Sequence, residues 1–273
     1  MSSVTALLPA WQAADFIQPT LDSLSGQTYA DLKVIVSVDA CTDRTAAICE
    51  AHASRDPRFT VVRQSERLGY VGNCNALLNM ADADYVLFAF HDDIIKPEYV
   101  ERLAAVLDAR PEVVLSFSDV LLTEVDGRQA HWVMDELEGV RDRVRRGMHM
   151  LNWKIKWWVP NRGLFRLARA RRIRGLKTHG AGEFSADWPW LFHMSLLGEF
   201  ARVPGELCLK YFKPGSMTLN WAFSTRQKLE VLSACMTELW DSELSAEEKI
   251  ALATPLLQVL VKLRALLEKK HAG

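Results

Sequence analysis

The sequence predicts an α/β fold with a mainly parallel sheet, helices on both faces and further helices at the C-terminal end. Short apolar or β-branched runs alternate with helical stretches over residues 1–120, and such alternation is typical of parallel strands joined by right-handed crossovers. With 273 residues, of which 49% are hydrophobic, the chain can bury a large core. Residues 221–273 change character and show the pattern of Leu- and Ala-rich helices.

Local signals place the elements of the first half. Strands are expected at residues 4–8, 34–38, 59–62, 85–90 and 113–120, where apolar or β-branched runs stop at polar residues or proline. Helices are expected between them, one ending near residue 25 and others over about residues 43–56, 69–80 and 97–109. Thr42 or Asp43 has the right place and side chain to cap the second of these helices.

The second half is less regular. We expect a turn at Asp126-Gly127, a helix over residues 186–197, a strand over 207–212 and helices over 225–239 and 246–268. The last helix carries leucines at helical spacing, which suit either a homodimer face or the core. No long linker divides the chain, so we expect one compact unit with a C-terminal helical extension at residues 221–273.

Composition excludes several classes of protein. The amino-terminal run MSSVTALLPAW lacks a basic region and turns polar at Gln12, so it predicts a first strand rather than a signal peptide, and a cytoplasmic protein. We find no apolar run near the roughly 18 to 20 residues that cross a bilayer. The five cysteines are odd in number and scattered, which favours reduced thiols and excludes a zinc knuckle.

Two adjacent carboxylates, Asp92 and Asp93, follow the apolar run over residues 85–90. A strand buried on both faces delivers the side chains after its last residue to the edge of the sheet, where open α/β folds bind ligands. Paired carboxylates there suit a divalent cation and the diphosphate that it carries. The alternative is that they only begin the turn before Pro97.

Five sequence blocks, in order and spacing, resemble the family 2 glycosyltransferases of the GT-A fold. They are LLPAW, SLSGQTY, VIVSVDACTDRT, RLGYVGNCNALL and DYVLFAFHDDIIKPEYVERL, which together span the first ~105 residues. The pieces LFRLARARRIRGL, SADWPWLFHMSLLGEF and KYFKPGSMT are similar to the family's acceptor half, less specifically. The resemblance implies a Rossmann-like sheet, with a nucleotide-sugar-binding half at residues 1–120 and an acceptor half at 121–220.

The implied reaction is transfer of a sugar from a nucleoside diphosphate donor, with UDP as the default, to a hydroxyl of a glycan or lipid-linked acceptor. The family is usually inverting and assisted by Mn²⁺ or Mg²⁺. The resemblance implies that Asp92 and Asp93 hold the metal, with Asp92 also at the donor. Phe90 stands where the family commonly has a first aspartate, and His91 is either structural or a weak metal neighbour.

The other donor contacts implied by the resemblance come from several blocks; they are Pro9, Ala10, Asp39, Arg67, Asn75 and Lys213. Asp39 is placed to accept a hydrogen bond from the nucleoside, and the alternative is a turn aspartate. For Asn75, the alternative to a donor contact is a hydrogen bond to loop backbone. Lys213 falls where the family often has His or Arg over the diphosphate, or is an ordinary solvated lysine. Val38 and Cys74 replace an acid and an arginine of the family.

The general base implied by the family's second-half motif is Asp187, with Glu183 in reserve. Attack by an acceptor hydroxyl requires a group that removes its proton, and Asp187 stands in SADWPW at the matching position. The alternative is an acid at a helix amino terminus, favoured by the helix dipole.

Residues 141–177, here called the basic segment, hold thirteen Lys or Arg and one acid in a chain of net charge −1. Trp153, Trp157 and Trp158 interleave with these cations, a mixture that suits an anionic membrane surface, stacking on sugars or nucleic acid. Alternatively the tryptophans pack inside and the arginines are solvated. We adopt the hypothesis of a peripheral membrane or acidic-glycan surface and expect no nucleic-acid partner.

Two rival functions are a catalytically inactive glycan- or nucleotide-binding scaffold and a sugar-phosphate nucleotidyltransferase. The inactive scaffold is suggested by Val38 and Phe90, which stand where the family commonly has acids. The second would be expected to show a Gly-rich basic loop after the first strand, and PAWQAAD lacks that composition.

Overall fold

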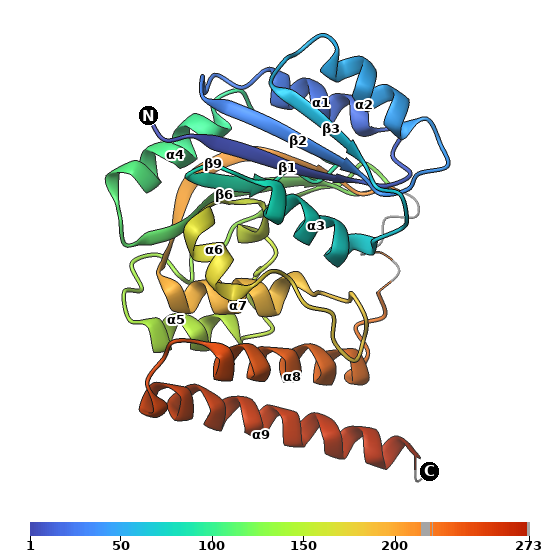
Figure 1. Cartoon of the computed structure of the whole chain (residues 1–273). Helices are drawn as coiled ribbons and strands as arrows, with labels where there is room; N and C mark the ends of the chain where they lie inside the picture. The colour runs from blue at the N-terminus through green and yellow to red at the C-terminus, as the bar shows by residue number, and fades with distance from the viewer. Residues whose placement is uncertain (214–218, 220, 272–273) are drawn as a thin grey trace.

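The structure, a computed structural model, describes residues 1–213, 219 and 221–271 and has one twisted sheet between layers of helices (Figure 1). Its strands are β1 Val4–Ala10, β2 Leu32–Val38, β3 Phe59–Arg63, β4 Tyr85–Phe88, β5 Asp93–Ile95, β6 Val113–Thr123, β7 Gln129–Trp132, β8 Leu164–Arg166 and β9 Glu199–Tyr211. Its helices are α1 Ile17–Ser25, α2 Thr45–Ala53, α3 Gly69–Met80, α4 Tyr99–Ala109, α5 Arg143–Met150, the 3-10 helix η1 Pro160–Arg162, α6 Leu167–Ile173, α7 Asp187–Leu197, α8 Thr225–Asp241 and α9 Ala246–His271.

The strands form one sheet in the order β3-β2-β1-β4-β8-β6-β9-β5, with β7 on β6. β1 pairs in parallel with β2 and β4, and β2 with β3. β8 enters antiparallel between β4 and β6, and β9 then runs parallel to β6. Six strands therefore point one way, which confirms the predicted α/β fold with a mainly parallel sheet.

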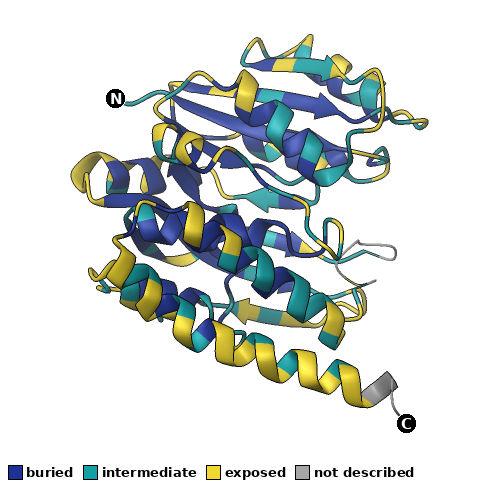
Figure 2. Cartoon of the chain, turned by 60° about the horizontal axis from the view of Figure 1, so that its bottom comes forward, coloured by how far each residue is buried: buried dark blue, intermediate teal, exposed yellow. Residues whose placement is uncertain are grey.

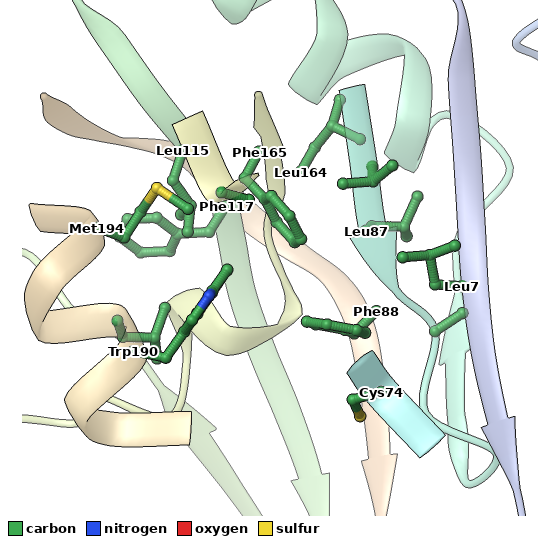
Figure 3. Packing of buried hydrophobic residues seen from close by; sticks show 14 of the residues in the cluster. Leu7, Cys74, Leu87, Phe88, Leu115, Phe117, Leu164, Phe165, Trp190 and Met194 are labelled. Atoms are coloured by element: carbon green, nitrogen blue, oxygen red, sulfur yellow. The ribbon is translucent and has the colours of Figure 1, made fainter. Parts of the chain in front are cut away.

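Helices cover both faces of the sheet, as the sequence predicts. α1 and α2 lie on one face, and α3, α6 and α7 lie on the other (Figure 1). Residues 187–196 of α7 are all buried, because this helix lies between the sheet and α8. Figure 3 shows Trp190 and Met194 of α7 beside Leu115, Phe117 and Phe165 of the sheet.

The first half matches the expected elements closely, whereas the second half differs. The predicted strand at residues 207–212 is the last part of β9, which begins at Glu199. Asp126-Gly127 does form the tip of the β6–β7 hairpin, and Gly127 has a φ of +83°, which glycine adopts without strain. The elements β5, β8, α5 and α6 were not expected, because each is too short to give a periodic signal. All five cysteines are free.

The basic segment divides between internal contacts and the C-terminal helices. Arg146 is 3% exposed and donates to the carbonyl of Ser195. Arg166 and Arg171 also donate to backbone carbonyls. Other cations pair with acids of the C-terminal residues, in the pairs Arg143–Glu248, Arg172–Glu243 and Lys177–Glu238. Much of this charge therefore holds the fold together, a use that none of the readings from sequence anticipated.

The last helix, α9, lies on the outside of α8 and is exposed along most of its length (Figure 2). Over residues 246–269 it is long and apolar enough to cross a membrane, by length and composition, and only 11% of its most apolar window is buried. This corrects the expectation that no apolar run approaches membrane-spanning length. Lys262 and Arg264 interrupt the apolar part of this helix, and further charged residues lie at its two ends, although the segment remains apolar on average.

Candidate functional site

A cavity of about 280 Å³ opens at the edge of the sheet where β4 ends. Its wall combines the residues that follow β4 with the ends of β7 and β9, the helix η1 and the start of α7. Ligands of open α/β sheets bind outside the carboxyl ends of the strands, so the cavity lies at the edge expected for the site. Its polar lining residues are His91, Asp92, Asn161, Arg162, Asp187 and Lys210.

Asp92 and Asp93 meet cationic side chains at this edge. Asp93 begins β5, and its Cα partner in the antiparallel β5–β9 pair is Lys210. The Lys210 Nζ lies 2.5 Å from Asp92 Oδ2 and 3.4 Å from Asp93 Oδ1, while Arg162 Nε lies 2.6 Å from Asp93 Oδ2. Burial acts to raise the pKa of Asp92, but the charge and hydrogen bond of Lys210, together with His91 and Lys213, outweigh it and lower that pKa to about 2. Asp92 is therefore ionised, and both aspartates are paired with cationic side chains.

These residues do not fit the divalent cation that the family resemblance implies. In the part of the chain that the structure describes, no group of three or more His, Cys, Asp or Glu side chains is placed to hold a metal ion. Asp93 is 5% exposed and faces Arg162 and Lys210. Nδ1 of His91 lies 3.0 Å from the carbonyl oxygen of Pro9. Of these two aspartates, Asp92 lines the cavity and Asp93 is not among the described lining residues, and Asp92 already has an ammonium partner.

Asp187, the expected base, is the first residue of α7 and lines the cavity. It is 8% exposed, and its Oδ2 accepts a hydrogen bond of 2.6 Å from Asn161. Burial raises its pKa to about 6, against a partial opposing effect of Arg162 and nearby N–H groups. A carboxylate with a pKa near neutrality is ionised at pH 7 and is still basic enough to take a proton.

Asp39 holds the start of α3. It is 1% exposed, and its two oxygens accept the N–H groups of Leu68 at 2.6 Å and Gly69 at 3.0 Å. Arg67 Nε lies 3.3 Å from Asp39 Oδ2, and the Arg67 guanidinium lies 3.4 Å from the centre of the Trp11 ring. The carboxylate is thus engaged with backbone, while the Arg67–Trp11 pair is the exposed feature beside it.

Glu183 and Asn75 make local contacts. Glu183 Oε1 accepts the N–H of Val71 at 2.8 Å, so the reserve base is engaged at the amino-terminal turn of α3, where the dipole favours an acid. Asn75 bonds both the N–H and the carbonyl of Leu176, at 2.8 and 2.9 Å. The alternative set out for Asn75, a hydrogen bond to loop backbone, is the arrangement observed.

The remaining expected donor residues surround the end of β1. Pro9 and Ala10 are buried there, and their carbonyl oxygens contact His91 and the N–H of Asp39. Lys213 lies after β9 with its Nζ 3.2 Å from the centre of the Phe16 ring. Burial lowers the pKa of Lys213 to about 8. The rest of the KYFKPGSMT block, residues 214–218, lies outside the described residues.

Aromatic rings form the other side of the cavity. Tyr70, Phe90, Trp132, Trp157, Trp158 and Phe212 line it. Trp157 stacks on Trp188 with ring centres 5.1 Å apart, and Trp153 packs edge-on against Trp188 at 4.5 Å. The tryptophans of the basic segment therefore pack inside or face the cavity, which agrees with their packing alternative.

Sequence reasoning missed Asn161, Arg162 and Lys210 as site residues. Arg162 is one of thirteen cations in the basic segment, and Lys210 is the first residue of the KYFKPGSMT block, three residues before Lys213. A usable signal for Lys210 was a lysine inside an apolar strand, because lysine is rarely buried without a partner.

Comparison with known proteins places the chain among glycosyltransferases. The family model for glycosyl transferase family 2 matches residues 5–169. Glycosyltransferase GlyA of Streptococcus pneumoniae is 32% identical over 100 residues, which is 37% of this chain and 14% of GlyA. The putative teichuronic acid biosynthesis glycosyltransferase TuaG of Bacillus subtilis is 29% identical over 124 residues, 45% of this chain and 49% of TuaG. The matches thus span half or less of these relatives.

Solved structures share the fold at low sequence identity. Residues 1–349 of S. aureus TarS in complex with UDP-GlcNAc superpose with a TM-score of 0.73 and 17% identity, covering 94% of this chain and 72% of that chain. The mannosyltransferase PcManGT from Pyrobaculum calidifontis, in complex with GDP-Man and Mn²⁺, gives a TM-score of 0.63 at 18% identity, with 100% and 76% covered. These likenesses establish a GT-A type fold.

Proposed function

The chain belongs to glycosyltransferase family 2, and we propose that it moves a sugar from a nucleoside diphosphate donor to a hydroxyl of a glycan or lipid-linked acceptor, with inversion at the anomeric carbon. The observation that carries this proposal is the cavity itself. One wall presents Asp187, a buried carboxylate with a raised pKa, and another presents Lys210 beside Asp92. Inverting transfer needs both a base and a positive charge for the leaving group.

The proposed step is one in-line displacement. The acceptor oxygen attacks the anomeric carbon, and the bond from that carbon to the diphosphate oxygen breaks. The hydroxyl proton passes to the carboxylate of Asp187, whose orientation is held by the 2.6 Å hydrogen bond from Asn161. The nucleoside diphosphate leaves with the electron pair of the broken bond. The expected Mn²⁺ or Mg²⁺ has no part in this step, because the residues present do not fit it.

Residues 1–120 are proposed to bind the donor. The exposed Trp11–Arg67 pair offers a flat surface for a nucleobase beside the ends of β1 and β2. Gln12 and Ala40 have φ values of +45° and +41° at these strand ends, and such strained backbone occurs often at ligand sites. UDP is the default nucleoside diphosphate, since TarS is solved with UDP-GlcNAc, whereas GDP is the alternative suggested by PcManGT.

Residues 121–220 are proposed to bind the acceptor. Trp132, Trp157 and Trp158 give the cavity broad apolar rings of the kind on which sugar faces stack. Among the residues that the structure describes, no hydrogen-bond partner is found for the buried Nε1 of Trp158 or the buried Oδ1 atoms of Asn161 and Asp187. A polyhydroxylated ligand supplies both donors and acceptors for such atoms. A saccharide acceptor is therefore favoured over a purely lipidic group at the reacting end.

The test is a donor panel. Purified protein is incubated with UDP-, GDP-, ADP- and CDP-sugars, and release of nucleoside diphosphate is measured with and without candidate glycans. We expect one nucleoside class to be turned over, with acceptor-dependent stimulation that Asp187→Asn removes. Binding of several donors with no release would favour the inactive scaffold instead. Synthesis of a sugar nucleotide from a sugar phosphate would identify a nucleotidyltransferase.

A peripheral position at an anionic membrane is proposed as the cellular context. The supporting feature is α9, where Leu257, Val261 and Leu266 are more than half exposed beside Lys262 and Arg264. Flotation with anionic vesicles tests it. Loss of binding in Leu257→Asp/Val261→Asp supports contact through α9, while loss on charge reversal of the basic segment supports the original assignment. A dimer in gel filtration that the α9 variant dissociates would identify a homodimer face.

A further inference from the structure

The proposed reaction needs positive charge beside the departing diphosphate, and this chain supplies that charge from its own side chains. Lys210 is 7% exposed, and its place is set by the β5–β9 ladder, in which it lies opposite Asp93. Its stem therefore rises from a strand of the sheet rather than from a loop. The ammonium group reaches Asp92 at 2.5 Å and Asp93 at 3.4 Å while also lining the cavity.

This ammonium group lies where a metal bound to the two aspartates would lie. A divalent cation is held by several oxygen ligands within about 2.0–2.6 Å, so at Asp92 Oδ2 it would compete with the Lys210 Nζ, which lies 2.5 Å from that oxygen. The second carboxylate offers no substitute, because Asp93 Oδ2 is paired with Arg162 at 2.6 Å. Both carboxylates therefore hold cationic side chains in place rather than binding a metal ion.

The charges of the side chains around Asp92 and Asp93 also disfavour a metal ion. Two carboxylates, Asp92 and Asp93, face Lys210 and Arg162, and Lys213 adds a third positive charge that acts on Asp92. These five groups sum to one positive charge before any ligand binds; the Asp187 carboxylate, which also lines the cavity, is the proposed base and is counted apart from them. Such a cluster attracts a diphosphate and repels a further divalent cation, and the repulsion is strong where water is largely excluded.

We propose that the ammonium group of Lys210, supported by the positive charge of Lys213, takes the place of the divalent cation, so that the donor diphosphate binds and departs without a metal. This inference rests on the proposed function. In it, Lys210 donates to a phosphate oxygen as the bond to the anomeric carbon breaks, and Asp92 holds the ammonium group in position. Lysine suits this role as a compact point charge with three donors.

The test is calorimetric titration of the protein with UDP, GDP, ADP and CDP, each in excess EDTA and again in excess MnCl₂. We expect one nucleoside diphosphate to bind in EDTA, with an affinity that Mn²⁺ does not increase. Lys210→Met should weaken that binding by about 10- to 100-fold, the loss expected for one charge-assisted hydrogen bond. Lys33→Met, which removes an exposed lysine of β2, should leave it unchanged.

The outcomes are distinct. Binding that requires Mn²⁺ would overturn the lysine assignment while leaving the proposed function intact, and no binding of any nucleoside diphosphate would overturn both. If Lys210→Met is too unstable to titrate, Lys210→Arg keeps the charge and should retain metal-independent binding. Paramagnetic resonance of Mn²⁺ gives a second readout on the wild-type protein: protein and nucleotide together should lower the free Mn²⁺ signal no more than the nucleotide alone does, and a larger loss would overturn the lysine assignment.

Discussion

Replacing Asp187 with asparagine should remove transfer activity and yet stabilise the protein at alkaline pH. The carboxyl is 8% exposed, and burial raises its pKa from 3.8 to about 6. A group whose pKa is higher in the folded state binds its proton more tightly there, so its effect on stability is favourable at low pH. That effect disappears as the pH rises through about 6, where the folded protein must hold a buried charge.

The size of the effect follows from the two pKa values. One pKa unit corresponds to about 1.36 kcal/mol, so ionisation of Asp187 costs the folded state about 3 kcal/mol at pH 8 and about 1.6 kcal/mol at pH 5. An asparagine does not titrate. Effects of packing are the same at both pH values, and the hydrogen bond from Asn161, which favours the ionised form, is already contained in the pKa of about 6. The difference in stability between variant and wild type should therefore shift by about 1.4 kcal/mol in favour of the variant from pH 5 to pH 8.

Urea denaturation of both proteins at the two pH values measures this shift directly, since the other titrating groups are common to both. Transfer by Asp187→Asn should fall by about 10²- to 10⁴-fold, the usual contribution of a general base. Wild-type activity should fall as the pH drops below about 6. A stability difference that is the same at pH 5 and pH 8 would refute the reasoning on burial, and retained activity would refute the assignment of the base.

Three further changes test other parts of the site. Trp157→Ala should lower the free energy of unfolding by about 3–5 kcal/mol, because the buried ring stacks on Trp188; a loss below about 1 kcal/mol in urea denaturation would contradict this packing. Asp39→Asn should cost about 1–3 kcal/mol in the same assay, since the carboxylate accepts two backbone N–H groups at the start of α3, and an unchanged midpoint would oppose that role. The affinity for the nucleoside diphosphate should decline as the pH rises through about 8, where Lys213 loses its proton. The affinity of Lys213→Arg should not change with pH over that range. An equal decline in both proteins would assign the effect to another group.

The first half of the fold could be predicted because its signals are local. Each of β1 to β4 is a short apolar run, and the intervening helices begin at turn residues such as Asp43, whose carboxylate accepts the N–H of Thr45 at the start of α2. The second half resisted prediction because β5 and β8 have three residues each. Strands of that length form because they pair with other strands, and a pairing partner far along the chain cannot be recognised from the local hydrophobic pattern.

In the site, too, local features could be predicted from the sequence and long-range contacts could not. Asp187 at the start of a helix and the acids after β4 were recognisable from sequence, because a strand end or helix start delivers its side chains to a predictable edge. The contacts of Asn75 and Glu183 were not, since each depends on a segment roughly a hundred residues away that happens to present a backbone group.

Asp92 and Asp93 mark the boundary between the two kinds of information. The apolar run before them determined by itself that two carboxylates would stand at the binding edge of the sheet. Only the tertiary structure decided what faces them, because Lys210 arrives through the pairing of β9 with β5 and Arg162 through η1. Short-range sequence sets where a side chain is delivered, whereas long-range strand pairing and burial set which charges it meets, and those charges decide the chemistry of this pair.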